Sequence, residues 1–136
     1  HIRKNGQEYG TTTGRPRRCG WFDTEVVRFA AGLNGVTELA LTKLDVFDDF
    51  ETIQLATGYE WGGKPAHYYD GDAIFLEECQ PTYESWPGWQ QSINAAQTFE
   101  ELPENARKYL QRLEAVTGLP ASFIGVGPRR EETIIR

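Results

Sequence analysis

Hydrophobic positions recur every three to four residues in two stretches of this chain, and each stretch predicts a helix. The first begins after Asp23, a suitable N-terminal cap, runs to about Leu33, and ends at Asn34 and Gly35. Its predicted apolar side holds Val26, Val27, Ala30 and Leu33. The second spans 103–117, with Pro103 in its first turn, and ends at Gly118, with Pro120 beyond. Its apolar face holds Ala106, Tyr109, Leu110, Leu113 and Val116.

Strict alternation between residues 51 and 61 predicts a strand instead, with Ile53, Leu55, Thr57, Tyr59 and Trp61 on one face. Gly62 and Gly63 then predict a turn into a partner strand around Ala66–Tyr69. Shorter apolar segments predict strands within 36–46, 121–126 and 133–135. Residues 5–20 are expected to form a polar loop, and 80–89 an aromatic loop punctuated by prolines. Thr98 and Glu101 fit a capping box.

Strands and helices are therefore interleaved, which favours an α/β fold. The length of 136 residues is that of a single domain, 1–136, and 39% hydrophobic residues allow a packed core. No apolar run approaches the roughly 18 residues of a membrane span. Cys19 and Cys79 form neither a disulfide framework nor a metal pattern, so a cytoplasmic protein with reduced thiols is expected. The absence of methionine favours a fragment or a processed piece.

Charge is distributed unevenly along the chain. Residues 1–18 hold five basic groups and one acid, Glu8, whereas the remaining residues hold nine basic and nineteen acidic groups. The acidic body argues against broad nucleic-acid binding, and the basic start predicts a local anion site. Its candidate is the segment Gly10–Arg18, where glycines permit close backbone approach, threonine hydroxyls can donate hydrogen bonds, and arginines offer planar forks to carboxylate or phosphate. Without its context, the same segment is equally typical of a solvated basic loop.

Two further segments can recognise a flat base. Leu41–Asp45 ends an apolar strand, and ligands of open α/β sheets bind beyond the carboxyl ends of strands. These residues are either a plain polar exit from the strand or a base-recognition segment, in which the Asp45 carboxylate can accept from guanine N1–H and the exocyclic amine while the Lys43 stem covers the base. Ile124–Pro128 is a strand ending in a glycine turn, which is either a plain turn or a backbone wall beside a ring.

Taken together, these segments resemble the C-terminal part of the adenylosuccinate synthetase family. The resemblance runs from about Gly6 to Arg136 and rests on four motifs in order. They are GTTTGRPRRCGW from Gly10, ALTKLDV from Ala40, PxYExxPGW from Pro81 and GVGP from Gly125. The family ligates IMP and L-aspartate, using GTP, to adenylosuccinate on the route to AMP. The resemblance thus implies the C-terminal part of a P-loop-NTPase-like fold.

The resemblance also implies roles for particular residues. The loop that closes over aspartate and IMP corresponds to Thr11, Thr12, Thr13, Gly14, Arg15, Pro16 and Arg17. Arg15 matches the residue that reaches IMP, and Arg17 also matches the one that reaches GTP. The guanine-binding segments correspond to Lys43, Leu44, Asp45, Gly125, Val126 and Gly127. Many members have serine where this chain has Gly125, so backbone contacts are expected there.

The family's phosphate loop, its catalytic aspartate and histidine, and its Mg²⁺ ligands are expected outside this chain, because no G-x-x-x-x-G-K-[ST] motif occurs here. No catalytic or metal-binding residue is therefore expected within it, and His1 and His67 are interpreted as surface or structural residues. The piece alone is expected to be inactive. The full-length enzyme is expected to be a cytoplasmic homodimer that binds neither nucleic acid nor membranes.

Two other functional classes remain open from the residues. The chain can be a non-catalytic anion- or nucleotide-binding module, or it can contact nucleic acid through Arg15–Arg18. A phosphate loop upstream of His1 would favour the enzyme over the module. Strong salt dependence of nucleic-acid binding would favour the third class.

Overall fold

The computed structural model describes residues 1–66 and 72–136. Its helices are α1 (Ile2–Asn5), α2 (Thr24–Asn34), η1 (Leu44–Phe47), α3 (Ala73–Glu78), η2 (Phe99–Glu101) and α4 (Glu104–Thr117), η marking 3₁₀ helices. Its strands are β1 (Phe22–Asp23), β2 (Leu39–Leu41), β3 (Thr52–Trp61), β4 (Lys64–Ala66), β5 (Gln80–Pro87), β6 (Ala121–Gly125) and β7 (Thr133–Ile135). Strands and helices are interleaved, so the predicted α/β class is confirmed.

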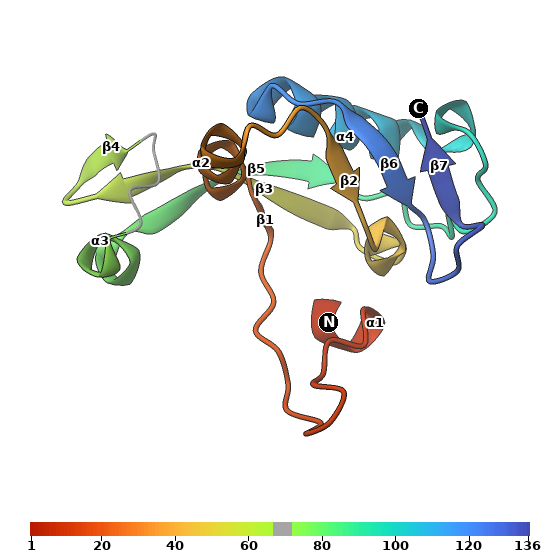
Figure 1. The fold of residues 1–136 in the computed structure, drawn as a ribbon, viewed down its shortest axis with the longest axis horizontal. Helices are drawn as coiled ribbons and strands as arrows, with labels where there is room; N and C mark the ends of the chain where they lie inside the picture. The colour runs from red at the N-terminus through yellow and green to blue at the C-terminus, as the bar shows by residue number, and fades with distance from the viewer. Residues whose placement is uncertain (67–71) are drawn as a thin grey trace.

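The strands form two sheets. In the first, β3 pairs with β1 in parallel and with β4 and β5 in antiparallel orientation. In the second, the order is β2-β6-β7, with β2 parallel to β6 and β7 antiparallel to it. Figure 1 shows β3 and β5 as a long ribbon that carries β4 and α3 at its far end, whereas β2, β6 and β7 lie at the opposite end of the molecule.

Helix α4 supplies the centre of the core. Its predicted positions Ala106, Tyr109, Leu110 and Leu113 are all buried, and they pack with Ile53 and Leu55 of β3 and with Ile124 of β6 among others. Gly118 ends the helix in the left-handed conformation at φ 73°, as its position after the apolar run predicts. A single apolar stripe therefore joins both sheets into one core.

Helix α2 begins and ends where the sequence predicts. The Asp23 carboxylate accepts from the backbone N–H groups of Glu25 and Val26, and Gly35 ends the helix at φ 62°. The predicted apolar side is largely exposed, however. Val26 is 37% exposed, Leu33 is 72% exposed and Ala30 is exposed too, whereas Val27 is half-buried.

The prediction of an aromatic loop at 80–89 is also wrong, because residues 80–87 form β5 and pair along almost the whole of β3. Prolines are tolerated because β5 is an edge strand, paired with β3 alone among the described strands, so missing N–H groups can face away from the ladder. Pro81 lies opposite Tyr59 and Pro87 opposite Thr52, near the two ends of this pairing.

Strand β3 confirms the predicted alternation only in its first half. A bulge between Ala56 and Gly58 shifts the register, so Ala56 and Gly58 are buried together with Tyr59. The turn at Gly62 and Gly63 is confirmed, with φ values of 57° and 73°, which suit a two-residue hairpin. The predicted partner strand is β4, which ends at Ala66; the remainder of that prediction, with His67, lies outside the described residues.

The predicted capping box at Thr98 is wrong in its geometry. Thr98 precedes the short helix η2 without a side-chain cap, and Glu101 instead accepts from the backbone N–H of Gln97 at 2.7 Å. The strand predicted within 36–46 is confirmed but short, since β2 covers only Leu39–Leu41 and the helix η1 follows at Leu44.

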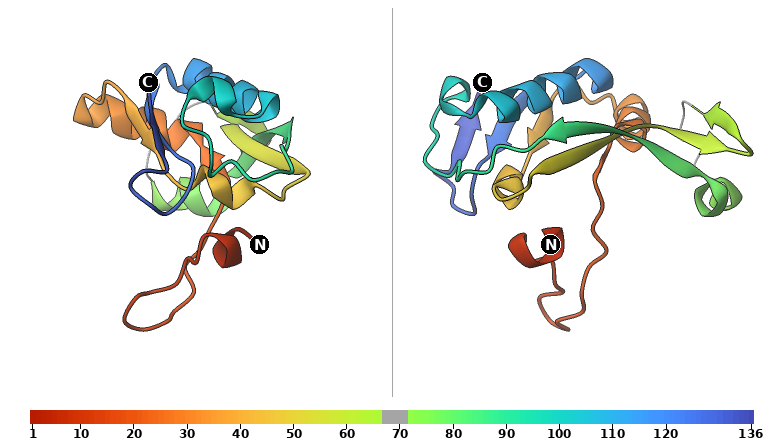
Figure 2. Two further views of the ribbon diagram at one scale, coloured as in Figure 1. Left: turned by 90° about the vertical axis from the view of Figure 1, so that its right-hand side faces the viewer. Right: turned by 180° about the vertical axis from the view of Figure 1, so that it is seen from behind.

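Residues 1–20 form an arm that leaves the body of the molecule. Both views in Figure 2 show its loop projecting away from the sheets, while α1 turns back beside η1. Two side chains fix α1 there: His1 Nε2 lies 2.8 Å from Asp49 Oδ2, and Asn5 donates to the Val46 carbonyl and to Asp49. The interpretation of His1 as a structural residue agrees with this contact.

Candidate functional site

Two of the predicted segments leave the same edge of a sheet. Because β2 and β6 are parallel, with Leu41 paired to Ile124, their carboxyl ends meet, and ligands of α/β sheets bind at such edges. The backbones approach closely here, since a Cβ atom built on Gly125 would lie 3.4 Å from the Thr42 Cα atom. The segments 43–45 and 125–127 are thus neighbours in space.

A cavity of about 400 Å³ opens at this edge. Three predicted guanine-binding residues line it, namely Lys43, Asp45 and Gly127. Its other walls are Asn5, Gly6, Gln7, Val46 and Pro128. The Leu44 and Val126 side chains instead belong to the core, at 5% and 0% exposure, so only their backbone groups are available to a ligand. Gly125 does not line the cavity and contacts the Thr42 backbone.

The surroundings of the Asp45 carboxylate favour a ligand that donates a hydrogen bond to it. Its Oδ1 atom is buried and has no hydrogen-bond partner within 1–66 and 72–136. Burial raises the pKa of this carboxyl, and the nearby charges of Asp48 and Glu132 raise it further, against a lowering effect of its own backbone N–H and of Lys43. A ligand that donates to Oδ1 would satisfy this atom and stabilise the ionised form.

Backbone strain is concentrated around the same cavity. Lys43 has φ 61° and Gln7 has φ 50°, and both line it. Residues with a Cβ atom rarely adopt this left-handed region, which costs about 1–2 kcal/mol. The only other described residue besides glycine with positive φ is Gln90. Strain of this kind gathers at functional sites, which supports a ligand-binding role for the cavity.

The predicted aspartate loop, Thr11–Arg17, forms the exposed tip of the arm. Backbone hydrogen bonds close its base, since Gly10 N donates to Arg15 O at 2.8 Å and Tyr9 forms a bridge with Pro16. At the tip, Gly14 adopts φ 65° and Thr13 Oγ1 accepts from the backbone N–H of Arg15. Thr11 and Thr12 are exposed, and the Arg15 guanidinium has no partner among the residues that the structure describes.

Glu8 joins this loop to the guanine segment, and sequence reasoning missed it. Its Oε2 atom accepts from Arg17 Nη1 at 3.1 Å, and its Oε1 atom pairs with Lys43 Nζ. The hydrogen bond from Lys43, helped by the charges of Lys43 and Arg17, lowers the pKa of this carboxyl. The sequence held one signal, since Glu8 is the single acid among the first 18 residues, beside five basic groups.

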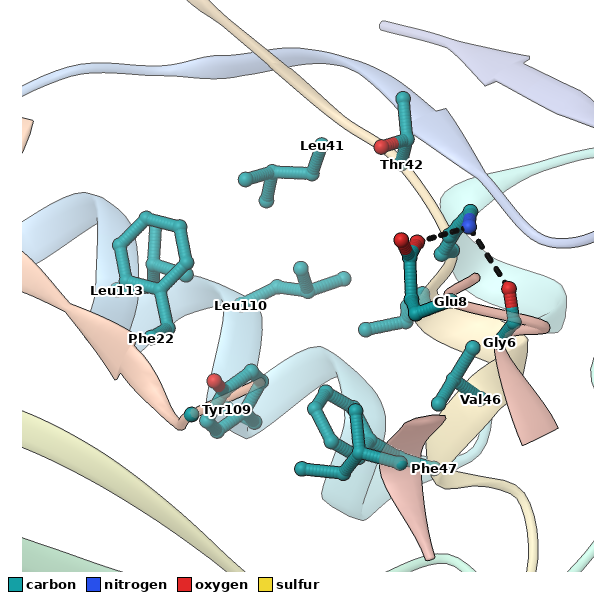
Figure 3. A pocket seen from close by; sticks show the side chains of 14 residues that line it. Gly6, Glu8, Phe22, Leu41, Thr42, Val46, Phe47, Tyr109, Leu110 and Leu113 are labelled. Atoms are coloured by element: carbon teal, nitrogen blue, oxygen red, sulfur yellow. Dashed lines mark hydrogen bonds and ion pairs between the residues drawn. The ribbon is translucent and has the colours of Figure 1, made fainter. Parts of the chain in front are cut away.

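A second, apolar cavity of about 220 Å³ lies between the arm and the body. Figure 3 shows Phe22, Leu41, Leu110 and Leu113 on its wall, with the Glu8 carboxylate directed toward the Lys43 ammonium at one side. The arm contacts the body through the ion pair of Glu8 with Lys43 and through the hydrogen bonds of His1 and Asn5 to Asp49.

Residues 1–66 and 72–136 hold no group of three or more His, Cys, Asp or Glu side chains that could bind a metal ion. Nor do they contain a helix long and apolar enough to cross a membrane. The expectation that Mg²⁺ ligands lie outside this chain stays a prediction.

Comparisons with known proteins agree on one family. The family model of adenylosuccinate synthetase matches residues 1–134. Adenylosuccinate synthetase from Geobacter sulfurreducens is 54% identical over 134 residues, which is 98% of this chain and 31% of the relative. The enzyme from Syntrophomonas wolfei subsp. wolfei is 48% identical over 98% of this chain and 32% of its own length.

A solved structure shares the fold. The structure of fully ligated adenylosuccinate synthetase from Plasmodium falciparum superimposes with a TM-score of 0.94 at 39% identity, covering 99% of this chain and 33% of that one. The chain therefore spans about a third of the length of the relatives it matches.

Proposed function

The chain belongs to the adenylosuccinate synthetase family, and we propose that it is the C-terminal part of an enzyme that ligates IMP and L-aspartate to adenylosuccinate at the expense of GTP. Because the chain spans 31% of the length of its relatives, the activity is that of a longer protein. Within that protein this part supplies guanine recognition and an anion-binding loop.

One observation carries the proposal: Lys43, Asp45 and Gly127 come from two separate segments and line one cavity. The buried Asp45 Oδ1 atom needs a donor, and guanine presents two, at N1 and at the exocyclic amine. Adenine has a lone pair at N1 and would be repelled by the same carboxylate. The aliphatic stem of Lys43 gives the flat base an apolar wall.

The arginine loop serves the other substrates. The reaction first transfers the γ-phosphoryl group of GTP to the 6-oxygen of IMP, and the amine of aspartate then displaces phosphate. Arg15 and Arg17 can each bind a carboxylate through two parallel N–H groups, and they neutralise the negative charge that develops during transfer. The exposure of the loop lets it close over a substrate.

Further parts of the proposal concern the longer protein. Mg²⁺ would be bound by residues outside this chain and would neutralise charge on the triphosphate. The enzyme would act in the cytoplasm, in keeping with the free thiols of Cys19 and Cys79. We also propose that it is a homodimer, by the resemblance to the family.

The test is an assay of the full-length protein with GTP, Mg²⁺, IMP and aspartate, in which adenylosuccinate is measured directly. We expect product from the full-length protein and none from residues 1–136 alone. GTP binding without product would favour the non-catalytic nucleotide-binding module. Product formed by the 136 residues alone would show that the catalytic groups lie within them and overturn this division of roles.

A further inference from the structure

One carboxylate connects the two parts of the proposed site. Glu8 divides its oxygen atoms between Arg17, at the base of the exposed loop, and Lys43, on the wall of the Asp45 cavity. Each contact is reinforced by the backbone. Arg17 N donates to Glu8 O at 3.0 Å, and Lys43 Nζ donates to Gly6 O at 2.8 Å.

We propose that Glu8 is a positioning residue that couples the two sites, so that guanine nucleotide and aspartate each strengthen the binding of the other. The identity of the two ligands rests on the proposed function, and the coupling goes beyond it. Glu8 need not touch either ligand, because it acts through the side chains of Lys43 and Arg17.

The sign of the coupling follows from the geometry of Lys43. Its stem lines the cavity while its ammonium reaches Glu8, so a base held against the stem restricts the whole side chain. A fixed ammonium restricts the Glu8 carboxylate, which in turn leaves Arg17 fewer orientations. The loop then loses less conformational entropy when aspartate binds, which is positive cooperativity. By linkage, aspartate must improve nucleotide binding by the same factor.

The size of the effect is limited by solvent. The Lys43 and Arg17 side chains are 52% and 59% exposed, so each ion pair is screened, and only the Glu8 side chain is largely covered, at 22%. Exposed pairs of this kind change equilibria by small factors. We therefore expect aspartate to lower the dissociation constant of a guanine nucleotide by about threefold to fivefold.

The experiment measures binding of GDP, which cannot be turned over, to the full-length protein by calorimetry with and without saturating L-aspartate. In the wild type the ratio of the two dissociation constants should be about three to five. In Glu8→Gln, which keeps the shape but removes the charge, the ratio should fall to about one. The matched control is Glu104→Gln, which removes an exposed ion pair with Lys108 on α4 and should leave the ratio unchanged.

A ratio of one in the wild type, or an unchanged ratio in Glu8→Gln, would overturn the coupling while leaving the proposed function intact. Failure of the wild type to bind GDP at all would overturn both. Should Glu8→Gln not fold, the wild type provides a second measurement. Coupling through screened charges must weaken as salt rises, so the ratio should approach one between about 0.05 and 0.5 M NaCl. A ratio that does not change with the salt concentration would contradict the role of Glu8.

Discussion

Replacing Asp45 by asparagine tests the guanine assignment most directly. The substitution keeps the shape of the side chain but converts an acceptor-only group into one that also donates. The Oδ1 atom of Asp45 is buried and unpartnered, so no other described residue competes with a bound base for it. Guanine would then face a donor where it needs an acceptor, whereas the 2-oxo group of xanthine would gain a donor.

The magnitude follows from hydrogen bonds to a charged group in a partly buried place. Losing the matched donors should cost about 2–4 kcal/mol of transition-state binding for GTP. At about 1.4 kcal/mol per tenfold, kcat/KM for GTP should fall by about 30-fold to 1,000-fold. XTP should become the better substrate of the variant.

The assay is adenylosuccinate formation by the full-length protein with GTP or XTP as the varied substrate. Asp49→Asn is the matched control, because Asp49 is an exposed carboxylate four residues away that contacts His1 and Asn5 and does not itself line the cavity. It should leave the preference for GTP unchanged. If Asp45→Asn still prefers GTP, with kcat/KM within about threefold of the wild type, Asp45 does not read the base.

The raised pKa of Asp45 adds a second readout to the same variant. A folded-state pKa above the unfolded value means that the native protein binds more protons in the interval between them, so ionisation of Asp45 lowers stability as pH rises through that interval. Asparagine removes this cost at neutral pH. The melting temperature of unliganded Asp45→Asn should therefore not fall, and a clear fall would contradict the account of the unpaired oxygen. Binding of GDP to the wild type should weaken on acidification at a higher pH than an ordinary aspartate would give.

Three further predictions concern the loop and the backbone. Arg15→Leu and Arg17→Leu should each raise the KM for aspartate and lower kcat, and lysine should rescue neither because a point charge cannot replace the planar fork; unchanged aspartate kinetics would assign the loop to plain surface. Gly88→Ala should lower the free energy of unfolding by at least about 2 kcal/mol in urea titrations, since the new Cβ would lie 1.8 Å from the Phe50 carbonyl oxygen. Gly32→Ala, in helix α2 with open space around it, should instead stabilise by about 0.5–1 kcal/mol, and equal effects at the two glycines would refute the steric argument.

Local signals predicted the elements that depend on local physics. Gly118 and Gly35 end their helices in the left-handed conformation, and Asp23 caps α2, because these preferences are set within one turn of helix. The prolines of 80–89 led to the wrong prediction of a loop. Their effect depends on whether a strand has one neighbouring strand or two, which is a property of the sheet. The bulge after Ala56 is likewise invisible in an alternating pattern.

Helix α2 shows a different limit of sequence reasoning. Its spacing identified an apolar side, and apolar sides of helices are usually buried, yet Val26, Ala30 and Leu33 of that side are exposed and Val27 is only half-buried. Amphipathic spacing states which face of a helix needs cover but not which part of a protein covers it. This chain spans a third of the length of its relatives, so its spacing can identify an apolar side of α2 that its own residues leave exposed.

In the site, too, short motifs determine some features and long-range contacts determine others. The motifs identified Asp45, and the parallel pairing of β2 with β6 explains why the segment of Gly127 lies beside it. The sequence did not reveal the role of Glu8, because its two partners lie 9 and 35 residues away. The closed base of the loop brings Arg17 to it, and the return of α1 beside η1 brings Lys43 to it. The backbone conformation of Lys43 was not predicted either, because lysine has no intrinsic preference for φ 61°. A residue that breaks a local rule is held there by its surroundings, and here the surroundings are its bonds to Gly6 and Glu8. The left-handed backbone of Lys43 and the ion pairs of Glu8 thus depend on each other. A change at Glu8 is therefore expected to alter the backbone that presents Asp45.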